Sequence, residues 1–301
     1  MLQKSLGGII MKKPKHLKHK NNRKCKHRSI KNLRYPSNLS QKEWDRIKCL
    51  FFKNKHIGRP RKWSPKLILN AILYILRTGC QWRYLPDGFP PWKTVYDYFR
   101  KWSRNGLIKK VHDIIRNLIR KRLGREKSPS IGIIDSQSSK TCEQGGERGY
   151  DAGKKVNGRK RHIVVDCLGF ILAVHVHPAN IQDRDGAKPT MKKLQNLYPL
   201  LTLILADGGY RGRLIDWVKE HLGIDLEIVQ RSDCAKGFKL LPWRWIVERT
   251  LAWIGRSRRM SKDFERLPET TETWIYLSMF KLMSQRLDNM ENHTNMAQNA
   301  S

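Results

Sequence analysis

Ser130 to Lys140, reading SIGIIDSQSSK, is the stretch around which the rest of the chain is organised. Small and apolar residues run from Ile131 to Ile134 and lead directly into Asp135, and polar residues follow. A β-branched run with Ser-Pro before it and a polar cluster after it is typical of a short buried strand. A carboxylate in such a strand loses hydration, which is costly unless a metal ion or a partner replaces the water. Taken alone, the stretch is equally consistent with a capping or turn Asp just past a strand end.

The same pattern recurs twice. Leu203 to Tyr210 reads LILADGGY, an apolar run that ends in Asp207. Pro242 to Met260 has helical periodicity and carries Glu248 among apolar residues. Three acidic residues that are each embedded in apolar sequence call for a common explanation.

The charge of the chain indicates its partner. Lys and Arg number 61 against 26 acidic residues in 301, a net charge of +35, so the compact chain repels itself unless it meets a polyanion. Six scattered cysteines without a C-x-x-C pair argue against a disulfide scaffold or a zinc ribbon. There is no signal peptide and no apolar run of about 18 residues, so we expect a cytoplasmic protein without a membrane span.

The first part of the chain is predicted to be helical. Residues 1–35 form a basic arm that we expect to be disordered. Ser40 and Glu43 make a capping box, and Ser64-Pro65 begins a helix that Gly79 ends. Two more helices are predicted at 92–103 and 107–123. Helices joined by tight turns on a basic background predict an all-α, helix-turn-helix-like DNA-binding domain over residues 36–124, although any small helical bundle has a similar pattern.

The second part is predicted to be α/β. After a change of composition at 124–130, three strands at about 131–135, 161–166 and 170–177 suggest an antiparallel meander. The remaining elements are helices at 183–198, 214–221, 242–260 and 269–287, with strands at 201–206 and 226–230. This order implies a mixed sheet flanked by helices over residues 125–288, followed by a polar tail at 289–301.

The three acidic residues then suggest a metal site. If the strands that end at Asp135 and Asp207 are adjacent, both carboxylates project at one edge of the sheet, and Glu248 completes the cluster. Three carboxylates a few Å apart repel each other unless cations lie between them. Oxygen ligands with open positions suit Mg²⁺, or Mn²⁺ as the alternative, and two such ions are the apparatus of phosphodiester chemistry.

Four motifs together resemble the DDE transposases of bacterial insertion sequences, in the insertion-sequence four/five superfamily. They are Ile134 to Ser138, Gly158 to His162, Ala206 to Tyr210 and Val247 to Trp253. The resemblance runs from about 39 to 287 and implies a ribonuclease-H-like catalytic fold in which Asp135, Asp207 and Glu248 are the catalytic metal ligands, with two ions. It also implies that the protein acts on the bacterial nucleoid.

The resemblance further implies residues that contact DNA. Arg244 and Arg249 would bind phosphates near the cut, and Lys160, Arg161 and His162 would line the DNA channel, although His162 also fits an exposed strand residue. The segment 57–62, IGRPRK, is either a basic linker or a hook for the minor groove. The remaining expected contacts are Arg256, Arg258 and Arg259, and, on the helical domain, Arg59, Arg61, Lys93, Arg100 and Lys101.

The implied reaction is DNA transposition. Water first cuts the DNA at the terminal inverted repeats of the element, and the freed 3′-OH then attacks target DNA directly. Because two ends are cut together, the resemblance implies a homodimer or higher assembly on double-stranded DNA. The alternatives are a ribonuclease-H-like endonuclease that cuts without joining, and an inactive DNA-binding remnant of an element.

Overall fold

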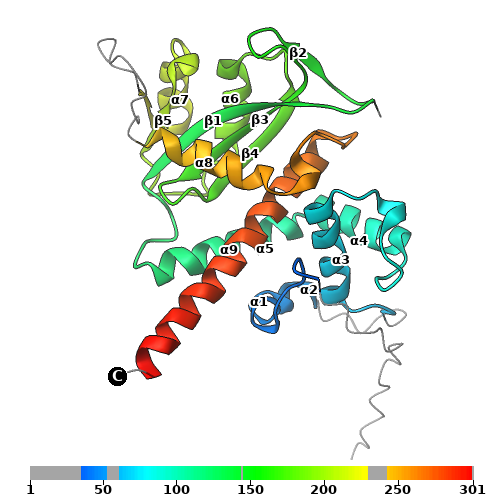
Figure 1. The fold of residues 1–301 in the computed structure, drawn as a ribbon. Helices are drawn as coiled ribbons and strands as arrows, with labels where there is room; N and C mark the ends of the chain where they lie inside the picture. The colour runs from blue at the N-terminus through cyan, green and yellow to red at the C-terminus, as the bar shows by residue number, and fades with distance from the viewer. Residues whose placement is uncertain (1–34, 53–60, 144, 230–242, 300–301) are drawn as a thin grey trace, which may run out of the picture.

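The computed structural model describes residues 35–52, 61–143, 145–229 and 243–299, with the side chains of the last seven left out. Most of the basic arm and Arg59 therefore lie outside the described residues. Within the described part, helices come first, a mixed sheet follows, and two helices end the chain (Figure 1). None of these helices combines the length and apolar composition that crossing a bilayer requires.

The N-terminal helices form largely where the capping signals predict them. The Ser40–Glu43 capping box is present, Ser64 caps the third helix, and Gly79 ends that helix with φ +72°. One difference is that the first helix divides into two short ones. The helices are α1 (Gln41–Asp45), α2 (Lys48–Phe51), α3 (Pro65–Thr78), α4 (Trp92–Arg104) and α5 (Leu107–Arg122).

The sheet has the expected mixed α/β arrangement, with strand order β2-β3-β1-β5-β6 and β4 paired to β3. Strands β1, β3 and β4 are antiparallel, whereas β5 is parallel to β1 and β6 is parallel to β5. The sheet is therefore mixed, as the sequence predicted. The strands are β1 (Ile131–Lys140), β2 (Gly149–Asp151), β3 (Val156–Asp166), β4 (Ile171–Pro178), β5 (Leu203–Ala206) and β6 (Asp225–Ile228).

Helices cover both faces of the sheet. One face packs against α6 (Asp183–Lys192) and α7 (Leu214–Leu222), as the shared core of Ile134, Val164 and Met191 shows. The other face packs against α5, α8 (Arg244–Gly255) and α9 (Pro268–Asn299). In Figure 1, α8 crosses in front of the strands and α9 runs below them.

Two elements are longer than predicted. Strand β1 does not end near Asp135 but continues to Lys140, because β3 pairs with it as far as the Lys140–Gly158 register. Asp135 therefore lies in the middle of a strand. Helix α9 continues to Asn299, through most of the segment that we expected to be a polar tail. By contrast, α6 ends at Lys192, several residues before its predicted end.

The hydrophobic core crosses the predicted domain boundary. Apolar side chains of α3, α4 and α5 belong to the same core as those of α8, α9 and one face of the sheet. Trp274 of α9 is buried and stacks on Phe99 of α4, with ring centroids 4.4 Å apart. Helix α9 is thus a common wall for the helical and the α/β parts of the molecule (Figure 1).

Candidate active site at the edge of the sheet

Asp135 and Asp207 come from neighbouring parallel strands. Ile133 pairs with Leu205 between β1 and β5, and each aspartate lies two residues further along its strand direction. Since side chains alternate along a strand, each aspartate points to the same face as Ile133 and Leu205, which is the face that α8 covers. The predicted proximity of the two carboxylates follows from this register, although Asp135 is mid-strand.

The environment of Asp135 penalises its charge. Its side chain is only partly exposed, and its Oδ1 accepts a hydrogen bond from the Ser136 N–H at 2.6 Å. Burial raises the pKa of Asp135 to about 6; the Ser136 N–H opposes this shift, and the negative charge of Asp207 adds to it. A carboxylate held in this way favours a nearby cation.

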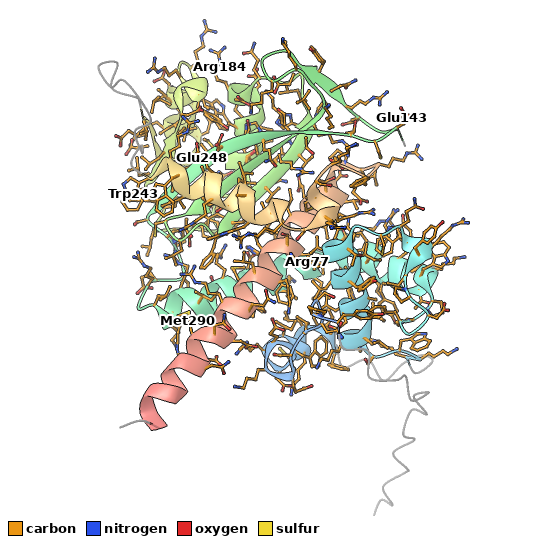
Figure 2. The ribbon with its side chains drawn as sticks, viewed as in Figure 1. Arg77, Glu143, Arg184, Trp243, Glu248 and Met290 are labelled. Atoms are coloured by element: carbon orange, nitrogen blue, oxygen red, sulfur yellow. The ribbon has the colours of Figure 1, made fainter. Side chains whose placement is uncertain are left out.

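Glu248 reaches the same edge from α8. Arg244 begins this helix, and its guanidinium lies between two carboxylates, with Nη2 3.3 Å from Asp207 Oδ2 and Nε 3.4 Å from Glu248 Oε1. The Glu248 side chain is 56% exposed, and Figure 2 shows Glu248 and Trp243 on the end of α8 that lies against the sheet edge. Arg244 thus supplies the positive charge that the acidic residues require.

The chemistry of the donors fits a divalent cation, although they are not gathered around one point. Within the described ranges, no three His, Cys, Asp or Glu side chains are grouped closely enough to hold a metal ion as they stand. The oxygens of Asp135, Asp207 and Glu248 are the hard ligands that Mg²⁺ and Mn²⁺ prefer. The Arg244 guanidinium lies where such an ion would neutralise Asp207 and Glu248.

A second polar cluster, which sequence reasoning missed, supports Asp135 from the other face of the sheet. Ser136 Oγ donates to Asp183 Oδ1 at 2.8 Å, and Lys160 Nζ lies 3.1 Å from the same oxygen. Although burial opposes it, these two donors lower the pKa of Asp183. Asp183 lies in a polar stretch, NIQDRDG, so no apolar run marks it, and its partners are distant in sequence.

Two buried histidines extend this cluster. Nδ1 of His162 lies 2.7 Å from Nε2 of His177, and His177 Nδ1 donates to the Pro178 carbonyl at 2.9 Å. Because a carbonyl only accepts, neutral His177 presents a bare Nε2, to which His162 donates. Burial lowers the pKa of His162 to about 3, so the ring is neutral, and its Nε2 has no hydrogen-bond partner in the described structure.

The structure corrects four of the predicted DNA contacts, because their side chains are buried. Lys160, Arg161 and His162 do not line an open channel: Lys160 Nζ donates to the Ile181 carbonyl, Arg161 donates to the Met260 carbonyl, and His162 is fully buried. Alternate side chains of β3 point into two helical layers, so neither face of the strand is free. Arg259 is also buried, paired with Glu265 at 2.6 Å.

The other predicted DNA contacts lie nearer the surface, and their role stays a prediction. Arg249 lies between the rings of Trp245 and Trp253, 4.5 Å from each centroid, and donates to the Leu168 carbonyl. Arg100 is half-buried and donates to the Tyr96 hydroxyl. Exposed side chains are those of Arg61, Lys93, Lys101, Arg256 and Arg258.

Two family profiles match the chain, and a relative is similar to part of it. The sequence profile of the family "Transposase DDE domain" matches residues 126–280, just over half of the chain, and that of the family "Putative transposase of IS4/5 family" matches residues 39–112. A relative from Burkholderia cepacia, "Putative transposase for insertion sequence element IS402", is 33% identical over 116 residues. That match covers 36% of this chain and 54% of the relative, so the chain spans about half the length of the relative.

Two solved structures resemble the chain at low sequence identity. The Mos1 strand transfer complex is 13% identical and has a TM-score of 0.28, with 78% of this chain and 79% of that chain covered. The Mos1 mariner paired end complex with Mn is 13% identical and has a TM-score of 0.29, with 82% and 84% covered. The first family profile covers more than half of the chain. The matched residues include the sheet that brings Asp135 and Asp207 to one edge, below Glu248. The extent of this match establishes the family. This chain belongs to the family of DDE-domain transposases.

Proposed function

We propose that this protein is an insertion-sequence transposase that binds the ends of its element and catalyses divalent-metal-dependent cleavage and strand transfer of DNA. The observation that carries this proposal is the position of Asp135 and Asp207. Their side chains project from adjacent parallel segments on the face of the sheet that α8 covers, and α8 carries Glu248. The net charge of +35 supports a polyanionic substrate.

Asp135, Asp207 and Glu248 are the residues that would hold the metal. A divalent cation, Mg²⁺ or Mn²⁺, would make water a stronger nucleophile at neutral pH and neutralise charge on the phosphodiester. Asp135 is fixed at the site by its rigid mid-strand position and by the Ser136 N–H. Arg244 would exchange its two carboxylate partners for a phosphate of the DNA.

The rest of the site holds and orients DNA. Arg244 and Arg249 on α8, with the exposed Arg256 and Arg258 just after it, would form a cationic track that begins with Arg244 at the carboxylates. Gly79 at the end of α3 lies against Arg258, so this track meets the N-terminal helices. These helices would bind the terminal inverted repeats, and a second copy of the chain would hold the second DNA end.

The experiment that tests this function is a cleavage and joining assay on duplexes that carry the inverted repeats flanking the gene. Asp135→Asn, Asp207→Asn and Glu248→Gln should each abolish cutting and joining while leaving binding of the duplex in place. Asp185→Asn, an exposed change on the first turn of α6, serves as the control. Loss of binding in the three variants would mean that the residues are structural, and cutting without joined product would indicate an endonuclease.

A further inference from the structure

A row of basic side chains on the other side of the sheet from α8 has no role in the function described so far. Arg184, Lys188 and Lys192 are spaced four residues apart on α6, so they share one face of the helix. Arg211 and Arg213 lie in the loop between β5 and α7. We call these five residues the α6 ridge.

The α6 ridge begins beside the carboxylates. A Cβ built on Gly208, the residue after Asp207, would lie 3.9 Å from Arg211 Nε. A Cβ on Gly212 would lie 3.5 Å from Arg184 Nη1. The short helical turn η2 (Gly208–Tyr210) therefore joins the arginines of the ridge to the edge of the sheet, and Figure 2 shows Arg184 at the outer tip of the molecule.

The far end of the ridge is organised around one aromatic ring. Lys188 Nζ and Lys192 Nζ lie 5.8 and 5.6 Å from the ring centroid of Trp217 on α7. His221 stacks on the same ring at 4.7 Å, nearly parallel. Cation–π contacts of this kind hold the two ammonium groups over α7, so the ridge has a defined path from the η2 turn along the α6–α7 layer.

The charge of the ridge is not neutralised within the protein. No ion pair links any of its five residues to a carboxylate of the described chain, and Arg184 donates only to the Gln182 amide oxygen. Like charges four residues apart destabilise a helix, and unpaired cations repel one another. The three positions on α6 span about 12 Å, which matches several phosphate steps of one DNA strand.

Resting on the proposed function, we propose that the α6 ridge binds the phosphate backbone of the DNA that receives the transferred end. Strand transfer brings two DNA segments to one set of carboxylates. The N-terminal helices, Arg244 and Arg258 lie with α8 on one side of the sheet, whereas the ridge approaches Asp207 from the other side. The second segment thus has a cationic surface of its own.

The salt dependence of DNA binding tests the ridge without any catalysis. The variant Arg184→Gln/Lys188→Gln/Lys192→Gln of the full chain is compared with wild type on a labelled duplex that lacks inverted repeats. Each lost phosphate contact lowers the slope of log K against log salt by about 0.9, so we expect a decrease of about 2.7. A matched control, Lys121→Gln/Arg125→Gln/Lys127→Gln, removes the same charge near the start of β1 and should leave the slope unchanged.

An unchanged slope in the ridge variant, or an equal decrease in both variants, would overturn the inference. Circular dichroism checks that each variant is folded, and Arg211→Gln/Arg213→Gln gives a second test outside α6. In the cleavage and joining assay, we expect the ridge variant to lose about tenfold or more in joining while it cuts element ends like the control. An equal loss of cutting and joining would assign the ridge to the cut end and overturn the inference. If Asp135→Asn cut like wild type, the proposed function would fail, and the slope measurement would still decide the role of the ridge.

Discussion

At the scale of single residues, the ionised carboxylate of Asp135 destabilises the folded protein, because burial disfavours its charge. The pKa of Asp135 is raised by burial to about 6, so the folded protein binds this proton more tightly than the unfolded chain. Stability is therefore lost as the pH rises from about 4 to about 6, and the loss persists at higher pH.

Asp135→Asn removes this penalty. We expect the free energy of unfolding of the metal-free protein to rise by about 1–3 kcal/mol at pH 7.5, with no gain at pH 4. Urea unfolding at the two pH values, with a chelator present, measures the change. Asp185→Asn, which is exposed, should change stability by less than about 0.5 kcal/mol at either pH. Equal stability of Asp135→Asn and wild type at pH 7.5 would show that the Asp135 charge is compensated.

Arg244 neutralises two of the carboxylates that would bind the metal, and this can also be tested. Because its guanidinium contacts both Asp207 and Glu248, we expect it to compete with a cation for them. Arg244→Met should raise the affinity of the DNA-free protein for Mn²⁺ by about tenfold and weaken DNA binding. Calorimetric titration measures the affinity, with Arg256→Met as the control on the same side of the molecule. Weaker Mn²⁺ binding by Arg244→Met would contradict the competition.

At the scale of elements, α6 approaches the strands closely enough to allow only a glycine. A Cβ on Gly186 would lie 2.3 Å from His177 Nε2 and 2.7 Å from His162 Cε1, and both rings are buried. This contact positions Asp183, at the start of the same helix, against Ser136.

Gly186→Ala should therefore lower the free energy of unfolding by about 2–3 kcal/mol, since the helix must move or the buried rings must leave their places. Urea denaturation measures this loss. Gly153→Ala is the comparison, because its Cβ would make only an ordinary contact at 3.5 Å with Asp151. If the two variants were equally stable, α6 would not be held at the distance that we describe.

The elements also show how far the sequence predicts this molecule. Caps such as Ser64 and periodic apolar positions predicted the helices, because these signals are local. The length of β1 was not predictable, because it depends on pairing with β3 across a polar stretch that no apolar pattern marks. For the same reason Asp135 and Asp207 could be found from the runs that precede them, whereas Asp183 and the burial of Arg161 depend on tertiary contacts.

At the scale of the whole molecule, α9 joins parts that the sequence suggested were separate. Arg46 of the N-terminal region pairs with Asp288 and Glu291, and Lys281 lies 2.9 Å from the buried Glu43. These ion pairs and the stacking of Trp274 on Phe99 fix the N-terminal helices on α9.

A fragment of residues 36–124 should consequently not fold by itself. We expect it to lack a cooperative urea transition, while the full chain unfolds in one transition, because the helices lose the apolar surface of α9. Circular dichroism and tryptophan fluorescence follow both. Trp274→Ala in the full chain should lower the free energy of unfolding by about 3–5 kcal/mol for both parts together. A fragment that unfolds cooperatively would restore the boundary near residue 124.

The long helix α9 also has a practical consequence for anyone who wishes to exchange the N-terminal helices for those of another protein. Helices borrowed from another protein could not simply be placed ahead of β1, since their apolar face would have to match a surface of α9, more than a hundred residues later in the chain. Such an exchange would instead require matching changes in α9.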